Sequence, residues 1–150
     1  MNTCLRRIAA ALVCTAIGAC APSPGPEEAV RLWLQEAEAA VEARDRGGLM
    51  EMISERYTDA RGNGRSDLDQ ILRVLFLRNR NILLVSKIDE LTIIGDTAAQ
   101  VRLTAGMTGA GGGVLGLSAD AYRFELDLEN DGDGWMLIGA RWAELGGQLR

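Results

Sequence analysis

The chain contains no histidine and only three cysteines among its 150 residues, and these absences exclude several kinds of chemistry. Without histidine, the Ser-His and Cys-His nucleophile pairs of many hydrolases cannot form. Zinc, copper and iron sites that are built from clusters of histidine and cysteine are excluded for the same reason. We therefore expect no metal and no cofactor.

Lysine is almost absent as well, because Lys87 is the only one in the chain. Sixteen basic residues face 21 acidic ones, which gives a net charge of −5. Nucleic acids and anionic lipid headgroups are bound through basic patches. We expect neither of them to be a partner of this acidic protein.

Residues 1–19 have the pattern of a secretory signal peptide. Arg6 and Arg7 form a short positive region, an apolar run follows over 8–17, and small residues come after it. The apolar run is too short to cross a bilayer, which takes about 20 apolar residues in a helix. Removal of this segment leaves 14 basic and 21 acidic residues, so the mature chain carries a net charge of about −7.

The sequence Ile17-Gly18-Ala19-Cys20 at the end of the signal resembles the lipobox of bacterial lipoproteins. The resemblance implies that Cys20 is acylated, becomes the new N-terminus and anchors the protein to the lipid bilayer of the cell envelope. Ala21 stands where an aspartate tends to retain such proteins at the inner membrane, which implies an outer-membrane protein that faces the periplasm. The alternative is cleavage nearby by an ordinary signal peptidase, which would leave a free thiol.

Residues 20–26 form a tether that contains all three prolines of the chain, and residues 27–150 form one domain. The composition of the chain, 47% apolar and 25% charged, is that of an ordinary globular protein. Cys4 and Cys14 lie within the signal, so an acylated Cys20 leaves no cysteine for a disulfide. The core alone must therefore hold the domain together.

Three helices are expected at the start of the domain. The first covers 27–44 and ends at the Gly47-Gly48 pair, and the second is a short piece over 49–54. The third begins at a capping box of Ser66 and Asp69. Apolar residues at helical spacing face inward on these segments: Val30, Trp33 or Leu34, Ala37 and Val41 on the first, Leu49, Met52 and Ile53 on the second, and Leu68, Ile71, Leu72, Leu75 and Phe76 on the third.

Strands follow the helices. β-Branched residues and leucines over 82–94 favour a strand, alternation over 99–107 predicts a second, and the glycine-rich stretch 106–116 predicts a loop. Residues 122–144 form a β-hairpin around a turn at 130–134. Its inward rows are expected to be Tyr122, Phe124, Leu126 and Leu128 in the first arm and Met136, Ile138, Ala140 and Trp142 in the second.

This order predicts an α+β fold in which the helices cover one face of a curved antiparallel sheet. From Glu27 to Leu145 the chain resembles the nuclear transport factor 2-like superfamily, which includes ketosteroid isomerases and polyketide cyclases. The segments that carry the resemblance are ARDRGGLMEMIS at 43–54 and DGWMLIGARW at 133–142. It implies a cone-shaped sheet that encloses an apolar pocket together with the first helix.

Asp59 is the candidate catalytic residue, because isomerases of this superfamily use an aspartate after the second helix as a general base. The alternative is that Asp59 is a surface or turn residue without a catalytic role. No convincing partner for developing negative charge accompanies it on the first helix or on a central strand, and such stabilisation is usually the largest catalytic contribution. We therefore expect binding rather than catalysis, and keep a ketosteroid isomerase- or polyketide cyclase-type enzyme as the alternative.

The predicted pocket is apolar and suits a lipid-like or aromatic small molecule. The residues expected to line it are Trp33, Tyr57, Val101, Leu103 and Trp142, although core packing is the plainer role for the three aromatic ones. A homodimer or an envelope protein that contacts the open face of the sheet is a further possible partner. The hypothesis for function is thus a lipid-anchored, non-catalytic ligand-binding or protein-interaction domain.

Two charged features have alternative interpretations. Arg102, Arg123 and Arg141 either converge inward on an anionic ligand or project outward against acidic neighbours. The acidic turn DLENDGDG invites a calcium site, but no bidentate glutamate stands at the spacing that an EF-hand loop requires. We therefore expect this turn to be solvated and free of metal.

Overall fold

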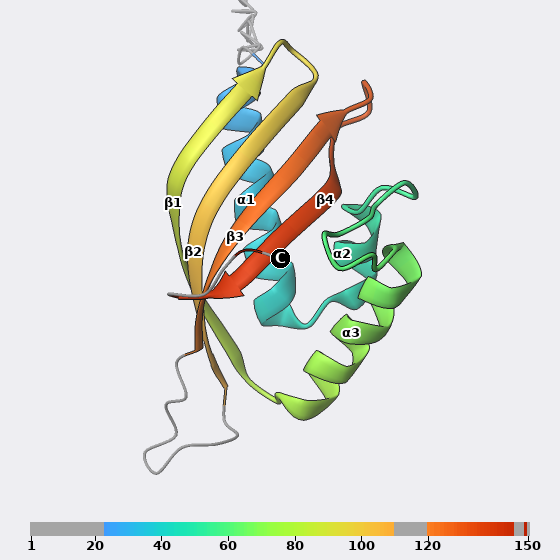
Figure 1. Ribbon diagram of the computed structural model, residues 1–150, viewed down its shortest axis with the longest axis vertical. Coiled ribbons are helices and arrows are strands. Elements are labelled where there is room, and N and C mark those ends of the chain that lie inside the picture. The colour runs from blue at the N-terminus through green and yellow to red at the C-terminus, as the bar shows by residue number, and fades with distance from the viewer. Residues whose placement is uncertain (1–22, 110–119, 146–148, 150) are drawn as a thin grey trace, which may run out of the picture.

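The computed structural model describes residues 23–109, 120–145 and 149, and its described part has three helices followed by four strands. Figure 1 shows one curved sheet with α1 across one face and with α2 and α3 near the end where β1 begins. The predicted α+β class is confirmed. The elements are α1 Pro26–Ala43, α2 Arg46–Glu51, α3 Arg65–Arg78, β1 Ile82–Ile94, β2 Ala98–Gly109, β3 Asp120–Asn130 and β4 Trp135–Glu144.

Helix α1 begins where the proline-rich tether ends. Pro26 is its first residue, where a missing N–H costs nothing, and an acidic first turn suits the positive end of the helix dipole. The helix ends at Ala43 because Arg44 adopts a left-handed conformation with φ of 58°. Gly47 and Gly48, predicted as the end of this helix, instead lie inside α2. A left-handed residue can end a helix without glycine when its N–H reaches the preceding carbonyls, as that of Arg44 does.

The N-cap of α3 lies two residues earlier than predicted. Gly64 takes the cap position, and its N–H donates to the carboxylate of Asp67 at 2.9 Å. The predicted capping box of Ser66 and Asp69 is therefore wrong. Asp69 faces α2 instead, where it is ion-paired with Arg46.

The sheet has the order β1-β2-β3-β4, and all neighbouring strands are antiparallel. β2 extends to Gly109, because Gly106, predicted as the start of a loop, pairs with Val85 on one side and Ala121 on the other. The rest of that predicted loop lies largely outside the described residues. The expected hairpin is present as β3 and β4, joined through residues 131–134.

A bulge in the β3–β4 pairing changes which residues of β4 face the core. The pairing shifts between Asp127, opposite Gly139, and Leu128, opposite Leu137. The extra residue moves the first half of β4 by one position. Trp135 and Leu137 are therefore buried beside Ala140, whereas Met136, which pairs with the outward Glu129, and Ile138 lie on the other face. The predicted inward row is wrong for Met136 and Ile138.

The main core lies between α1 and the concave face of the sheet. Leu128, Val30 and Val101 are its largest fully buried side chains. A second cluster of Leu49, Phe76 and Ile82 joins α2, α3 and the start of β1. Buried members of the two clusters lie between residues 30 and 140, so residues 23–150 contain the described core. The main cluster consists of Val30, Trp33, Leu34, Ile53, Tyr57, Ala99, Val101, Leu103, Ala105, Leu128, Trp135, Leu137 and Ala140.

The outward side of α3 departs from its predicted pattern. Leu72 and Leu75 pack on the second cluster, as expected from their helical spacing. Ile71, predicted to face inward with them, is 45% exposed, and Leu77 is 75% exposed. Because α3 contacts the rest of the domain along a narrow strip, only part of its apolar set is covered.

Candidate functional site

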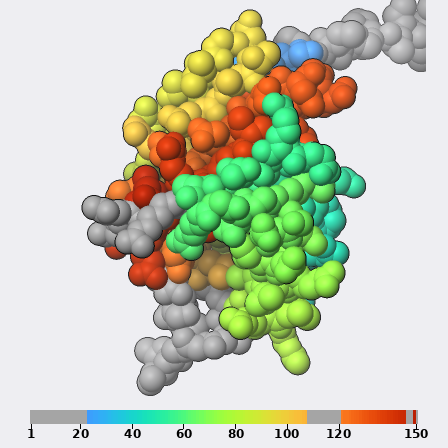
Figure 2. Space-filling model, turned by 45° about the vertical axis from the view of Figure 1, so that its right-hand side comes forward, coloured from blue at the N-terminus to red at the C-terminus, as the bar shows by residue number. Residues whose placement is uncertain are grey.

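Tyr57 and Asp59 lie on a segment, residues 52–60, that runs along the outer edge of β4. In Figure 2 this part of the chain lies over the last strand, with α3 beside it. Only 2% of Tyr57 and 5% of Asp59 is exposed, so both side chains are held inside the domain. The backbone bonds that join the segment to β4 are Leu137 N–H to Met52 O at 3.0 Å, Ser54 N–H to Leu137 O at 3.0 Å, Thr58 N–H to Ile138 O at 3.2 Å and Ala60 N–H to Ala140 O at 3.1 Å.

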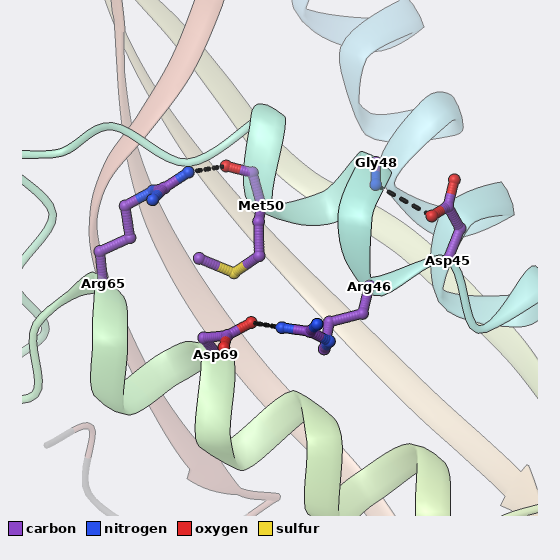
Figure 3. Close-up of polar contacts among 6 residues, drawn as sticks. All are labelled: Asp45, Arg46, Gly48, Met50, Arg65 and Asp69. Carbon is purple, nitrogen blue, oxygen red and sulfur yellow. Dashed lines mark hydrogen bonds and ion pairs between the residues drawn. The ribbon is translucent and has the colours of Figure 1, made fainter.

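Two arginines fasten α3 to α2 and to the residues that follow it (Figure 3). Arg65, the first residue of α3, donates to the carbonyl of Met50 at 2.7 Å and to that of Ile53 at 3.0 Å. Arg46 of α2 is ion-paired with Asp69 of α3. The bonds of Arg65 join the start of α3 to carbonyls at and just after the C-terminal end of α2. They also determine the direction in which the chain leaves α2 toward Tyr57.

Asp59 uses both carboxylate oxygens within its own turn. Oδ1 accepts hydrogen bonds from the backbone N–H groups of Arg61 and Asn63, each at 2.8 Å. Oδ2 accepts a third from the side-chain amide of Asn63 at 2.8 Å. A general base needs a lone pair that reaches the proton it removes, and here three donors hold the carboxylate. The structure therefore gives Asp59 the geometry of a turn-forming residue.

Asn63 is a site residue that the sequence analysis did not single out. Aspartate and asparagine bond readily to nearby backbone groups in turns, so their spacing in the Asp59–Asn63 stretch was an available signal. The segment was predicted only as a loop. Which side chain of a loop supports which backbone group depends on the path of the turn, and the residue pattern alone does not specify that path.

Tyr57 is held in its protonated form. Burial raises the pKa of its phenol well above the usual value of 10.0, and the negative charge of Asp59 raises that pKa further. A neutral phenol donates a hydrogen bond but does not act as a base near neutral pH. Tyr57 therefore packs in the core as a neutral residue.

Trp142 lies at the border of the core, where Arg61 covers it. The guanidinium carbon of Arg61 lies 4.5 Å from the centre of the Trp142 ring, a cation–π contact. Arg61 follows Asp59 in the same turn, so the hydrogen bonds of Asp59 also position this contact. One small turn thus places a guanidinium against the ring.

The other predicted pocket residues are brought together, but they are tightly packed. Trp33, Val101 and Leu103 belong to one buried cluster with Tyr57, and Trp142 packs against that cluster. Val101 is completely buried. Among the described residues these five candidates therefore form part of a filled core.

One polar atom in this core has no hydrogen-bond partner among the described residues. It is the indole Nε1 of Trp33, which is buried on α1. A buried N–H without an acceptor is unfavourable by about 1–3 kcal/mol, so such groups need an explanation. The indole N–H is a hydrogen-bond donor available inside the cluster.

Two surface hollows lie away from these candidates. One, of about 410 Å³, is lined by Asn63, Asp67 and three residues of the outward side of α3. The other, of about 250 Å³, lies beside the hairpin turn, where Arg56 is ion-paired with Glu129 at 2.7 Å. Neither hollow is lined by the predicted pocket residues.

The three arginines of the strands project outward. Arg102 is ion-paired with Glu90, and Nε of Arg141 lies 3.0 Å from a carboxylate oxygen of Glu125. Arg123 is exposed on the same face. The arrangement is the outward one, which favours cross-strand pairs in contact with solvent over an inward anion site.

Several other predictions concern parts outside this site. Cys20 lies outside the described residues. Within the described ranges, no helix is long and apolar enough to cross a membrane. Over the same ranges, histidine, cysteine and acidic side chains form no group of three suited to a metal ion. In the acidic turn, the side chains of Asn130 and Asp131 accept hydrogen bonds from the backbone N–H groups of Gly132 and Asp133.

Comparison with known proteins yields no matching family model and no curated relative. Solved structures do match. Bd1075 of Bdellovibrio bacteriovorus has a TM-score of 0.67 and 12% identity, over 78% of this chain but only 41% of that protein. A proposed dehydratase of the nuclear transport factor 2-like family from Streptomyces avermitilis has a TM-score of 0.67 and 16% identity, over 79% and 94% of the two chains.

A proposed scytalone dehydratase from Novosphingobium aromaticivorans is similar as well, with a TM-score of 0.68 and 11% identity over 82% and 85% of the two chains. Identities this low carry information about the fold and none about activity. The described chain therefore has the nuclear transport factor 2-like fold.

Proposed function

We propose that the protein is a lipoprotein of the bacterial cell envelope whose periplasmic domain binds a partner without catalysis. The IGAC sequence at Cys20 supports an acyl anchor, and Ala21 supports the outer membrane as its location. Five residues lie between Cys20 and Pro26, where α1 begins. Such a tether spans at most about 20 Å, so the domain works close to the bilayer surface.

The observation that carries the non-catalytic role is the state of Asp59. Its carboxylate accepts three hydrogen bonds from Arg61 and Asn63, and its side chain is buried. Proton abstraction by Asp59 would require breaking bonds that shape its own turn. The filled core around Val101 also favours contacts at the outer surface over a deep reaction chamber.

A small enzyme of the ketosteroid isomerase or polyketide cyclase type is the second candidate, and the indole of Trp33 favours it. Its buried N–H has no acceptor among the described residues. The carbonyl oxygen of a ligand that displaced core side chains would satisfy it, and such a donor stabilises negative charge on that oxygen. The same N–H equally serves an apolar ligand that carries one carbonyl group and is bound without reaction.

The anchor is tested by cell fractionation and mass spectrometry of the full chain. Wild-type protein is expected in the outer-membrane fraction with acyl chains on Cys20, because two or more chains give stable membrane binding. Cys20→Ala protein is expected to leave the membrane. If the cysteine of membrane-bound wild-type protein were unmodified, the anchor would be rejected.

The non-catalytic role is tested with wild-type, Asp59→Asn and Trp33→Phe domains. We expect no turnover of an enone or a polyketide-like substrate by any of them. If an apolar ketone binds, Trp33→Phe is expected to weaken it about fivefold, the value of one hydrogen bond, while a hydrocarbon of the same shape is unaffected. If the wild-type domain turned over either substrate and Asp59→Asn did not, the binding role would be rejected in favour of the enzyme.

A further inference from the structure

The two edges of the sheet are treated differently by the rest of the domain. The edge at β4 is bonded to residues 52–60. Beyond β1, at the other edge, the described residues supply no further strand. The carboxylate of Glu42 on α1 accepts the outward N–H of Leu84 at 2.9 Å. β1 spans 13 residues, so most of this edge is available to another strand.

β1 carries an exposed row of side chains on the face of the sheet that points away from α1. Leu83 is 56% exposed, Val85 64% and Ile94 58%. A bulge between Ile88 and Glu90 shifts the alternation by one residue. Residues Leu83, Val85 and Lys87 therefore share this outer row with Glu90, Thr92 and Ile94.

This row is complementary to itself when it is reversed. Aligned antiparallel with a second copy, the row places Leu83 opposite Ile94, Val85 opposite Thr92 and Lys87 opposite Glu90. Each pair occurs twice because of the two-fold symmetry. Apolar side chains meet at both ends and opposite charges meet near the centre, the kinds of cross-strand pair that stabilise antiparallel sheets.

We propose that the partner of this domain is a second copy of the same chain, bound through antiparallel pairing of β1 with β1 in this register. The proposal rests on the interaction role given above and names the partner and the surface. It joins two four-stranded sheets into one. It also accounts for three exposed apolar residues that the fold of one copy leaves in solvent.

The backbone supports the same register. The N–H of Leu84 points away from β2, because its acceptor is Glu42. Leu84 pairs with Met107, Leu91 with Val101 and Ile93 with Ala99. These three partners lie at alternate positions along β2, so their backbone groups have the same direction. N–H groups alternate in direction along an antiparallel strand, so those of Leu91 and Ile93 also point outward. In the proposed register Leu84 lies opposite Ile93, and the two residues exchange backbone hydrogen bonds once the carboxylate of Glu42 releases the N–H of Leu84.

Other registers lose this match. A shift by two residues in one direction places Leu83 opposite Thr92 and Val85 opposite the charged Glu90. In the other direction it keeps Val85 opposite the apolar Ile94 but places Lys87 opposite Thr92. A shift by one residue brings outer side chains opposite inner ones, which strand pairing does not tolerate. Within one copy Lys87 is ion-paired with Asp89 at 3.3 Å and Glu90 with Arg102, and the proposed register brings Lys87 and Glu90 of the two copies opposite each other as well. Charge and apolar pattern together therefore select a second copy.

Cross-linking tests the register in the soluble domain 23–150, which contains the described core and has no cysteine of its own. A domain with both Val85→Cys and Thr92→Cys is expected to form a disulfide-linked dimer. Across the proposed interface these two Cα atoms lie about 4.5 Å apart, within disulfide range. Within one chain, seven residues of strand separate them by roughly 20 Å, so an internal bond is excluded.

The matched control replaces Val85 and Ile94 by cysteine, because these positions are out of register by two residues. It is expected to cross-link at least tenfold more slowly. Equal rates for the two double variants would overturn the register.

Sedimentation equilibrium of the domain without added cysteines tests the dimer itself. We expect a concentration-dependent dimer whose Kd rises at least tenfold in Leu83→Asp, because each copy then places a charge opposite Ile94. Leu77→Asp changes an exposed leucine on α3 and is expected to leave Kd unchanged. A domain that stays monomeric up to millimolar concentration would overturn the proposed pairing. The membrane anchor and the absence of turnover would still be decided by their own experiments.

Discussion

Burial and hydrogen bonding decide what Asp59 and Tyr57 do. In the sequence, an aspartate that follows a short helix resembles a catalytic base. In the structure, the same carboxylate is the acceptor around which Arg61 and Asn63 fold. Tyr57, two residues earlier, is kept neutral by burial and by the nearby negative charge. Asp59 thus stabilises the turn from which Arg61 packs on Trp142, and Tyr57 packs in the core.

Replacement of Asp59 by asparagine is expected to lower the free energy of unfolding by about 1–3 kcal/mol. An amide presents an N–H₂ group where a carboxylate oxygen accepted a hydrogen bond, and this leaves a buried donor without an acceptor. Urea unfolding measures the loss, with the m-value unchanged. Asp133→Asn, in the exposed hairpin turn, is the control and is expected to change stability by less than about 0.5 kcal/mol. Equal losses in the two variants would contradict the role given to Asp59.

Stability is expected to fall at high pH because of Tyr57. The folded-state pKa of this tyrosine is raised above the unfolded value of 10.0. Below about pH 10 both states keep the proton, so the contribution is fully present. Above it the unfolded state loses the proton while the folded state retains it, which costs at most about 1.4 kcal/mol per pH unit.

Thermal or urea unfolding between pH 8 and about pH 11 measures this slope. Tyr57→Phe has no proton to lose, so its stability is expected to fall less steeply over the same range. If the free energy of unfolding fell equally with pH in the wild type and in Tyr57→Phe, burial would not raise the pKa of Tyr57.

At the scale of whole elements, the bulge in the hairpin has the largest consequence. Alternation correctly predicted two long strands and the turn between them. It predicted the wrong face for the first half of β4, because one extra residue opposite Asp127 and Leu128 reverses the side on which Met136 lies. The segment 52–60 bonds to β4 at the bulge, through Leu137 and Ile138. The pairing of β3 with β4 thus determines which side chains of β4 enter the core.

The bulge is tested by two neighbouring substitutions. Trp135→Ala is expected to lower the free energy of unfolding by about 3–5 kcal/mol, because it empties a buried position. Met136→Ala, one residue later on the opposite face, is expected to cost less than about 1 kcal/mol. Urea unfolding of both variants gives the comparison. A larger loss of unfolding free energy in Met136→Ala than in Trp135→Ala would show that Met136 faces the core, as regular alternation predicts.

For the whole molecule, the absence of histidine and the confinement of cysteine to residues 4, 14 and 20 make the core the source of stability. The described core is continuous from α1 through the sheet, with a smaller cluster beneath α3. Its size suits a domain of about 120 residues that folds without cross-links.

Chelators and reducing agents are therefore expected to leave the unfolding temperature of residues 23–150 unchanged within about 1 °C. A ligand or metal that bound only the folded state would raise that temperature, and its removal would lower it. Scanning calorimetry with and without EDTA or dithiothreitol provides the measurement. A decrease of several degrees with EDTA would identify a metal that the acidic hairpin turn holds after all.

The sequence by itself determined the α+β class, the order of helices and strands and the limits on chemistry. These follow from local properties: the periods of 3.6 and 2 along each segment, the turn residues at 130–134 and the missing histidine. Contacts that this periodicity does not report decided the rest, some within one turn and some between distant segments. The carboxylate of Asp59 is bound by its own turn, Asp69 pairs with Arg46 instead of capping α3, and a bulge selects Trp135 over Met136. Each outcome depends on which groups meet in space, and periodicity along one segment carries no information about that.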